Sequence, residues 1–559
     1  MTLGRAPEQG ELGPSSATYC DGLLSPTSIY GLLYRECHEL FPDDAFADLF
    51  ADIGRSSVPP RIVAVVMVLQ RLEGLSDREA VERFSFDVRW KYAAGGLPMS
   101  YPGFVHTVLV GMRARLRASK DPDRIFRTVL DVAKEAGTVG RWRVLDSTPL
   151  YDAVATQDTV TMIRSAIRGL LRVADEPPTT ALATALRGVL KRDDDYATAG
   201  KPVCEWEDKA AREALIDALA RDAHAVLAHL DGMDLPAAVK QAAELLATVV
   251  GQDLEQAEDG RFRIARRVAK DRVISTVDPE ARHGHKTAAR GFDGYKGHIA
   301  IDPDSEIITG AVTTPANVGD GSVAKELLAD VVPMTPQDAD AEPTAKNRVE
   351  HAPAAPEPAP GETGDVARAR EAVEVYGDAS YGTAEILRHL EGNGAVPMVK
   401  VQAPAAHDGH FSKDAFVIDL DNDTVTCPAN RLVQIRRRED GSGTASFGVG
   451  CKTCPMASSC TDSKEGRTIK INKDEHALQQ ERTRQKSPEW RRNYKATRPK
   501  VERKLAHLMR RRHGGRRARM RGRERVAQDF TMLCAAVNLQ RLAQLGLRSV
   551  DARAAAATA

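Results

Sequence analysis

The chain has 559 residues, of which 42% are hydrophobic and 28% are charged, a composition typical of a soluble protein with roughly two to four domains. Its 78 basic and 78 acidic residues balance, so the average charge gives no indication of a polyanionic partner. No apolar run reaches the length of a membrane span, and residues 1–20 lack the features of a secretory signal. We therefore expect a cytoplasmic protein with no membrane contact.

The balanced total hides a local excess of positive charge. Residues 461–525 contain 23 basic and 8 acidic residues, a net charge of +15. A disordered, solvated tail would explain such a run, but the apolar stretch 526–545 follows it, which favours an ordered segment. Phosphate contact, with salt-sensitive DNA affinity, is the better interpretation. The DNA-contacting residues predicted here are Arg510, Arg511, Arg516 and Arg517.

The N-terminal part of the chain reads as helical from about residue 25 to residue 134. Pro60 suits the first turn of a helix, and Gly74 suits its end. Ser76 and Glu79 fit a capping box that opens a second helix. The pair is either a helix-turn-helix DNA reader or an ordinary packed pair of helices, and the pattern leaves both open.

After this region, apolar strands alternate with helical stretches. A short strand at 142–145 is expected to end at Asp146, and another at 373–376 to end at Asp378. The expected elements between and after them are a helical insertion (158–267), a β-hairpin (294–302 and 306–312), a helix (323–331), a helix (384–391) and a strand (396–401). A third acid, Glu502, lies in a later basic helix.

This order resembles a ribonuclease H-like core, in which three carboxylates converge on two Mg²⁺ ions. Carboxylates suit Mg²⁺ because this hard cation prefers oxygen ligands, and Mn²⁺ can take its place. Two ions about 3.5–4 Å apart can activate an attacking oxygen and stabilise a leaving one. Taken singly, Asp146 and Asp378 would be read as turn or capping residues, and Glu502 as a solvated charge.

The local motifs resemble those of bacterial insertion-sequence DDE transposases, in the branch with a Tyr-Arg-Glu-Lys signature (insertion-sequence families four/five type). The matching residues around the third acid are Tyr494, Arg498 and Glu502. The other matching motifs are Asp146-Ser-Thr-Pro149, Gly294-Tyr295-Lys296, Thr314-Pro315-Ala316-Asn317, Gly377-Asp378-Ala379-Ser380-Tyr381-Gly382 and Ala535-Ala536-Val537-Asn538-Leu539. The signature Lys is absent from its expected place, which is Met509, and Arg510 and Arg511 follow it.

The resemblance implies an enzyme that binds the terminal repeats of its own mobile element, cuts double-stranded DNA and inserts the element elsewhere. Asp146, Asp378 and Glu502 would hold the Mg²⁺ ions, while Tyr494, Arg498 and Lys296 would contact DNA. Tyr494 could instead be a half-buried tyrosine, and Arg498 could pair with Glu502. A homodimer on DNA, associated with the nucleoid, is expected. The alternatives are an inactive descendant that regulates by binding DNA, and a hydrolytic nuclease on the same core.

Four cysteines form a compact set in a β-like region. Cys451 and Cys454 have the C-x₂-C spacing of a zinc knuckle, with Cys427 before them and Cys460 after them. In a reducing compartment this set predicts one structural Zn²⁺, with free thiols or an iron–sulfur cluster as alternatives. Three histidines, His283, His285 and His298, match no ligand spacing and are expected to contact DNA or to be exposed.

The expected fold class is α/β. It consists of a ribonuclease H-like mixed sheet preceded by an all-helical domain and interrupted by a helical insertion and a small Cys₄ zinc-binding β insertion. The expected segments are a disordered tail (1–24), a helical DNA-binding domain (25–134), the first part of the core (135–157), the helical insertion (158–267), the core hairpin and helix (268–332), a Pro/Ala/Glu-rich linker (333–366), the core with the second Asp (367–408), the zinc-binding insertion (409–472), the basic helical end of the core (473–545) and a tail (546–559).

Overall fold

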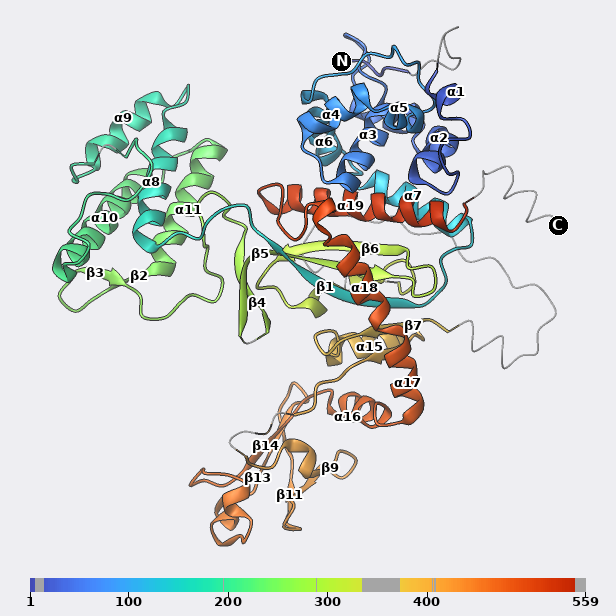
Figure 1. Cartoon of the computed structure of the whole chain (residues 1–559). Coiled ribbons are helices and arrows are strands. Elements are labelled where there is room, and N and C mark those ends of the chain that lie inside the picture. The colour runs from blue at the N-terminus through green and yellow to red at the C-terminus, as the bar shows by residue number, and fades with distance from the viewer. Residues whose placement is uncertain are drawn as a thin grey trace, which may run out of the picture.

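The computed structural model describes residues 1–5, 15–194, 196–287, 289–333, 372–404, 406 and 409–547. A mixed sheet lies at its centre, with the N-terminal helices on one side and a helical insertion and a small β unit projecting from it (Figure 1). The predicted linker at 333–366 falls, apart from its first residue, outside the described residues. None of the described helices is both long and apolar enough to cross a lipid bilayer.

The central sheet has the strand order β4-β5-β1-β7-β8, and β6 also pairs with β5. The strands are β1 (Arg143–Tyr151), β4 (Arg282–Thr287), β5 (Arg290–Ile301), β6 (Ile308–Pro315), β7 (Glu374–Gly377) and β8 (Val396–Val399). β1 is antiparallel to β5 and parallel to β7, and β7 is parallel to β8. β4 and β6 pair with successive segments of β5.

Both faces of the sheet are buried against a hydrophobic core. Because successive side chains of a strand point to opposite faces, each strand can contribute to both cores. On β1, Val144 belongs to the large core that contains the N-terminal helices, whereas its neighbour Leu145 belongs to a second core. The second core is completed by α12 (Ala324–Leu327) and α15 (Ala384–Gly392). One strand therefore contributes to two separate cores, and this packing fixes the position of Asp146, which directly follows Leu145.

The N-terminal helices share one core with the last helix of the chain, α19 (Arg523–Gln544), and several of them pack directly on it. These helices are α2 (Ile29–Leu40), α3 (Pro60–Glu73), α4 (Asp77–Phe86), α5 (Val88–Ala93), α6 (Thr107–Ala118) and α7 (Arg124–Glu135). As predicted, α3 ends at Gly74, whose φ of 70° suits glycine, and Ser76 and Glu79 form a capping box. All of α3 except Glu73 is buried, so this helix belongs to the core.

The expected disordered tail is wrong for residues 16–20, which form α1 (Ser16–Cys20). Ser15 caps this helix by accepting from Thr18 N, and the Ser16 hydroxyl donates to Leu97 O at 2.7 Å. Cys20 is only 3% exposed. Polar composition suggested a free end, but this short helix is held by a hydrogen bond to a residue 81 positions away.

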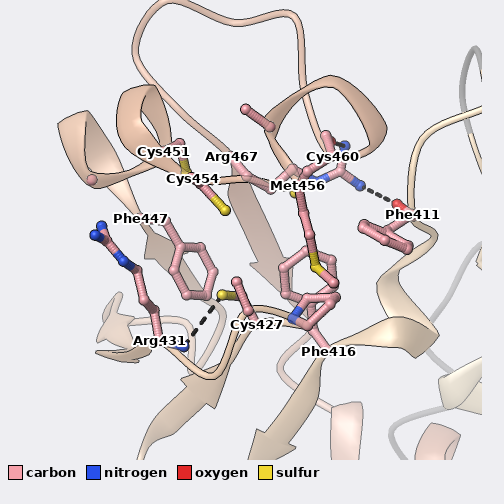
Figure 2. Close-up of a pocket in the computed structure, with 14 residues that line it drawn as sticks. Phe411, Phe416, Cys427, Arg431, Phe447, Cys451, Cys454, Met456, Cys460 and Arg467 are labelled. Atoms are coloured by element: carbon pink, nitrogen blue, oxygen red, sulfur yellow. Dashed lines mark hydrogen bonds between the residues drawn. The ribbon is translucent and has the colours of Figure 1, made fainter.

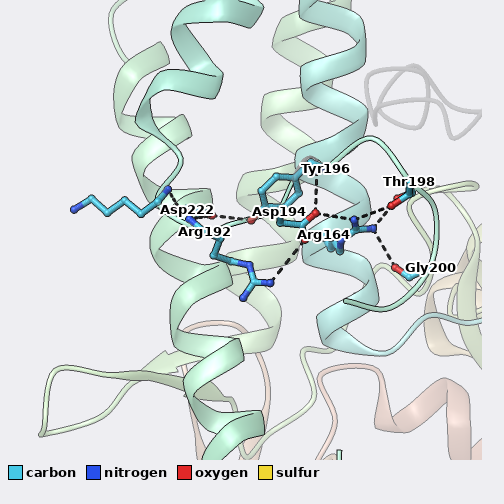
Figure 3. Close-up of polar contacts among 8 residues, drawn as sticks. Arg164, Arg192, Asp194, Tyr196, Thr198, Gly200 and Asp222 are labelled. Carbon is cyan, nitrogen blue, oxygen red and sulfur yellow. Dashed lines mark hydrogen bonds and ion pairs between the residues drawn. The ribbon is translucent and has the colours of Figure 1, made fainter. Parts of the chain in front are cut away.

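The insertion between β1 and β4 has a hydrophobic core of its own. It contains α8 (Thr159–Ala174), α9 (Thr180–Val189), α10 (Lys209–Leu230), α11 (Ala237–Asp253) and a small hairpin of β2 (Leu254–Gln256) and β3 (Phe262–Ile264). A buried polar network fixes the loop between α9 and α10: Arg164 pairs with Asp194, and Tyr196 donates to Asp222 at 2.7 Å (Figure 3).

The second insertion is a small β unit, also with its own core. Its strands are β9 (Val417–Asp419), β10 (Thr424–Thr426), β11 (Leu432–Gln434), β12 (Arg436–Arg437), β13 (Gly443–Ser446) and β14 (Thr468–Ile471). The chain then returns to the core through α16 (Glu475–Arg484), α17 (Pro488–Thr497) and α18 (Pro499–Leu508), and α18 crosses the sheet over β1 (Figure 1).

Candidate active site

Three carboxylates from distant parts of the chain surround one guanidinium group. Arg498 Nη2 lies 3.1 Å from Asp146 Oδ2 and 3.9 Å from Asp378 Oδ2, and Arg498 Nη1 lies 3.5 Å from Glu502 Oε1. The Arg498 side chain is 8% exposed, whereas exposure rises from 14% for Asp146 to 41% for Asp378 and 64% for Glu502. The cluster is therefore closed on the Asp146 side and open to solvent at Glu502.

The parallel pairing of β1 with β7 brings the two aspartates together. Val144 is paired with Tyr376, so two residues further along each strand Asp146 is level with Asp378. Backbone amides hold both carboxylates: Ser147 N donates to Asp146 Oδ1 at 2.8 Å, and Ser380 N donates to Asp378 Oδ1 at 2.9 Å.

The expectation that a strand ends at Asp146 is wrong, because β1 continues to Tyr151. Taken singly, Asp146 suggested a turn or a cap. In the structure residues 147–151 stay extended because they pair with β5 as far as Gly294. Asp378, by contrast, directly follows β7.

Burial controls the electrostatics of the cluster. Burial raises the pKa of Asp146 to about 6, and the nearby charge of Asp378 adds to the rise, while Arg498 opposes it. Burial lowers the pKa of Arg498, but the charges of Asp146 and Asp378 outweigh that effect and raise it. Arg498 Nε and Nη1 are buried and lack a hydrogen-bond partner. The guanidinium therefore offsets part of the negative charge of the three carboxylates, and two of its nitrogens still lack a hydrogen-bond partner.

Oxygen ligands from three carboxylates are the donor set that Mg²⁺ prefers. With Arg498 between them, however, the acids do not form a ready metal cluster. Within the part of the chain that the structure describes, no group of three or more His, Cys, Asp or Glu side chains is arranged to hold a metal ion. The donor chemistry fits divalent ions, provided that Arg498 moves aside.

Tyr494, predicted to contact DNA, makes contacts within the protein. Its hydroxyl donates to Gly377 O at 3.1 Å, directly before Asp378, and its ring stacks on Trp490 at 4.7 Å. Lys400 Nζ also lies over the Tyr494 ring, 5.6 Å from its centroid. Tyr494 therefore supports the backbone that carries Asp378.

Lys296, also predicted to contact DNA, is held by a residue that the sequence analysis missed. Its Nζ donates to Asp320 Oδ1 and to Val318 O, both at 2.8 Å, and the side chain is 14% exposed. Asp320 Oδ2 accepts from the Ser147 hydroxyl at 2.7 Å, next to Asp146. The signal that could have revealed Asp320 is its place three residues after the Thr314-Pro315-Ala316-Asn317 motif.

Two further groups near this site are completely buried. The Tyr381 side chain is 0% exposed and its hydroxyl has no hydrogen-bond partner. His298, expected to be exposed or on DNA, is also 0% exposed, and its Nε2 lies 2.9 Å from Thr314 Oγ1. The exposure expected for His298 is wrong because it lies in the middle of β5, between two paired strands. His283 and His285, in contrast, are exposed on β4.

The arginine-rich segment after α18 divides into exposed and buried members. Arg510, Arg511, Arg516 and Arg517 are exposed and make no ion pair with any described residue. Arg519 is partly buried and donates to Leu75 O, which ties the segment to the N-terminal helices. This segment is ordered and offers four free cations at the surface.

The helix that would read DNA in a helix-turn-helix is α4, because α3 is buried. The exposed face of α4 carries Arg78, Glu79, Glu82 and Arg83, two charges of each sign. A balanced face lacks the excess of positive charge typical of a major-groove helix. The alternative of an ordinary packed pair describes α3 well, and DNA reading by α4 stays a prediction.

The four predicted zinc ligands line one pocket in the small β unit (Figure 2). The Cys427 and Cys454 sulfurs point toward a common space, and the Arg431 amide donates to Cys427 Sγ at 3.4 Å. Burial raises the pKa of Cys460, and the neighbouring Cys451, Cys427 and Cys454 add to this rise. These sulfurs are neighbours, but their positions do not form a ready metal cluster among the described residues.

Comparison with known families gives three matches. Models described as transposase DDE domains match residues 259–343 and 426–543, and a model described as a transposase domain matches residues 27–115. No curated protein and no solved structure matches the chain. The matched regions include Glu502 and the pocket cysteines but neither Asp146 nor Asp378. Two regions of the chain match transposase DDE domains, and these domains indicate an enzyme that cleaves DNA and transfers its strands.

Proposed function

We propose that this enzyme is the transposase of an insertion sequence, of the Tyr-Arg-Glu-Lys branch, and that it cleaves DNA at the terminal repeats with Asp146, Asp378 and Glu502. The observation that carries the proposal is the meeting of these three carboxylates around Arg498. Residues separated by up to 356 positions meet only because β1, β7 and α18 converge there. Such a cluster of like charges beside a solvent opening is typical of a catalytic centre.

Each residue has a distinct role in this mechanism. Two bound divalent ions would supply activation of the attacking oxygen and stabilisation of the leaving oxygen. Asp146 and Asp378 are held by backbone amides and offer rigid carboxylates, whereas the exposed Glu502 can move to close the site. Once its carboxylate partners engage cations, Arg498 is free to bind the scissile phosphate, which its planar guanidinium can grip through two hydrogen bonds. No nucleophilic side chain is required.

The test is cleavage and strand transfer by Asp146→Asn, Asp378→Asn and Glu502→Gln variants. The DNA substrate is the chain's own flanking genomic sequence, with Mg²⁺. We expect all three variants to bind DNA and to lose cleavage, while Asp304→Asn, which removes an exposed carboxylate paired with Lys500, keeps full activity. Unchanged cleavage in the Asp146→Asn variant would disprove the assignment.

Two rival functions give different results in the same assay. A hydrolytic nuclease would cut but yield no strand-transfer product on a supercoiled target. An inactive descendant that regulates by binding would bind terminal DNA but give neither product. Mass measurement of the complex with paired ends tests the homodimer, because one protomer per pair of ends would exclude it.

We also propose that the small β unit binds one structural Zn²⁺ through Cys427, Cys451, Cys454 and Cys460. The support is the common pocket and the influence of the other three cysteines on the pKa of Cys460. Zinc would stabilise a unit whose own core is small. One equivalent of zinc is expected in the purified protein, reduced in a Cys454→Ser variant and unchanged in Cys204→Ser, which lies in the other insertion. Iron and sulfide in place of zinc, or no metal at all, would refute the assignment.

A further inference from the structure

A short loop links the helical insertion to the catalytic sheet, and a single buried residue holds both of its ends. Ala265 N donates to Asp253 O at 2.8 Å, and the Arg272 guanidinium binds the Asp253 carboxylate through two hydrogen bonds of 2.7 Å. Asp253 is 4% exposed and also accepts from Thr159 Oγ1 at 2.9 Å. Residues 265–272, the basic loop, are therefore presented from a fixed base.

The basic loop carries positive charges that the protein leaves unpaired. Residues 261–272 contain six basic residues and one acidic residue. Arg266, Arg267 and Lys270 are exposed and form no ion pair with any residue that the structure describes, and Val268 between them is 80% exposed. Repulsion among these cations is a cost that an anionic partner would remove.

The one acidic residue in the basic loop cannot neutralise them, because it is already engaged. Asp271 Oδ1 accepts from Asn317 Nδ2 at 2.7 Å and pairs with Arg282 Nε at 2.8 Å. These contacts fix the loop to the start of β4 and to the end of β6. The cations therefore lie beside the catalytic sheet rather than on a separate unit.

Strand register places the basic loop and the arginine-rich segment at the same end of the sheet. Across that end, Arg517 bridges to Tyr151, Tyr151 pairs with Gly294, and Gly294 pairs with Arg282, which binds the basic loop. Three strand spacings of about 4.8 Å make roughly 15 Å. Duplex DNA carries about one phosphate charge per 1.7 Å of axis when both strands are counted, so a stretch of duplex as long as this rim carries roughly nine phosphates.

The β4–β5 hairpin adds further cations at this end. β1 pairs with β5 only as far as Gly294, so residues 290–293 of β5 pair with β4 alone and extend past the end of β1. Lys286 and Arg290 are exposed there and have no ion-pair partner in the described ranges. The hairpin thus extends the positive rim beyond the last residue of β1.

We propose that the basic loop is a second DNA-binding element, which holds the phosphate backbone of duplex DNA beside the catalytic sheet through Arg266, Arg267 and Lys270. The inference rests on the proposed function, because it takes duplex DNA as the substrate. It gives the basic loop a role in holding that DNA. Backbone contact rather than base reading follows from the residue types, since exposed Arg and Lys on a loop with no groove-sized element position DNA without specifying sequence.

The test measures binding of a fluorescent mixed-sequence duplex of about 30 base pairs to the full chain over a range of KCl concentrations, without Mg²⁺. The variant is Arg266→Gln/Arg267→Gln/Lys270→Gln. Its matched control is Arg187→Gln/Lys209→Gln/Arg221→Gln, which removes the same charge from exposed, paired positions of the same insertion. We expect the salt slope of log K to fall by about 2–3 and affinity to fall about 10- to 100-fold in the variant alone. Lys286→Gln/Arg290→Gln should lower the slope by a further one to two, roughly.

Several results would overturn the proposal. They are an unchanged salt slope in the basic-loop variant, an equal loss in the matched control, and DNA binding that is unaffected while binding of an acidic protein or of RNA is lost. Each leaves the proposed function standing if the wild-type chain still cleaves DNA and Asp146→Asn does not. Loss of cleavage in wild type would instead count against the proposed function.

Discussion

Replacing Arg498 by Gln tests how the acidic cluster is held in the absence of cations. Removing one partner of a buried ion pair costs about 3–5 kcal/mol, because it leaves an uncompensated charge. Only Asp146 is well buried here, at 14% exposure, while Asp378 and Glu502 are 41% and 64% exposed and largely screened by water. The lower end applies, so we expect the free energy of unfolding to fall by about 3 kcal/mol.

Magnesium should reverse this loss. In the wild-type enzyme a divalent ion competes with the Arg498 guanidinium for the carboxylates, whereas in the variant it does not. We therefore expect Mg²⁺ to stabilise Arg498→Gln more than wild type, by about 1.4 kcal/mol for each tenfold gain in affinity once the ion is in excess. Urea unfolding with and without Mg²⁺ measures both effects.

Two further variants make this test specific. Arg503→Gln, on the same helix but 62% exposed and paired with Glu306, should change neither the stability nor the magnesium effect. Asp146→Asn combined with Arg498→Gln should be less destabilising than the sum of the two changes, because the buried charge is gone. Equal stability of wild type and Arg498→Gln without Mg²⁺, or equal stabilisation by it, would refute the idea that Arg498 occupies the place of a cation.

Three other predictions concern the surroundings of the site. Burial lowers the pKa of His298 from 6.5 to about 4. Neutral His298 therefore stabilises the fold above pH 6.5, and this contribution, roughly 3 kcal/mol, is lost as pH falls through 4. A His298→Asn variant should show a shallower acid dependence of urea unfolding, and an unchanged slope would contradict this. Tyr494→Phe removes the bond to Gly377 O, and should cost about 1 kcal/mol and slow cleavage at constant DNA affinity, whereas weaker DNA binding would show direct contact. Asp222→Ala leaves Tyr196 and two backbone amides unpaired, which should lower the free energy of opening the loop between α9 and α10 by about 2–3 kcal/mol. Limited proteolysis should therefore cut this loop faster, and an unchanged cleavage rate would show that the network is dispensable.

The order of strands and helices was predictable because it follows from local patterns. The capping signals of Gly74, Ser76 and Glu79 determine where α3 ends and α4 begins, and the apolar run before Asp378 is the buried strand β7. The extent of β1 was not predictable, because nothing near Asp146 shows that a strand 140 residues later pairs with the polar run beyond it.

The ion-pair partners of the basic residues could not be predicted from the sequence either. Lys296 and Arg517 belong to motifs or runs that predict phosphate contact, but Lys296 pairs with Asp320, whereas Arg517 is exposed and forms no ion pair within the described residues. The sequence contains the charges but not the distances that decide which of them are paired. Arg498 is the clearest example, since pairing with Glu502 was foreseen from their spacing, whereas pairing with Asp146 depends on the sheet.

The chain around Arg498 explains why one residue can touch all three acids. Pro499 is the first residue of α18 and ends α17 just before it, yet Arg498 keeps right-handed helical angles of −55° and −39°. Proline is tolerated at this first-turn position because the missing N–H would have had no partner. The helical path therefore continues with Tyr494, Arg498 and Glu502 one turn apart on one face, and that face meets the end of β7 and the middle of β1. This shared face is what lets one guanidinium lie between Asp146, Asp378 and Glu502.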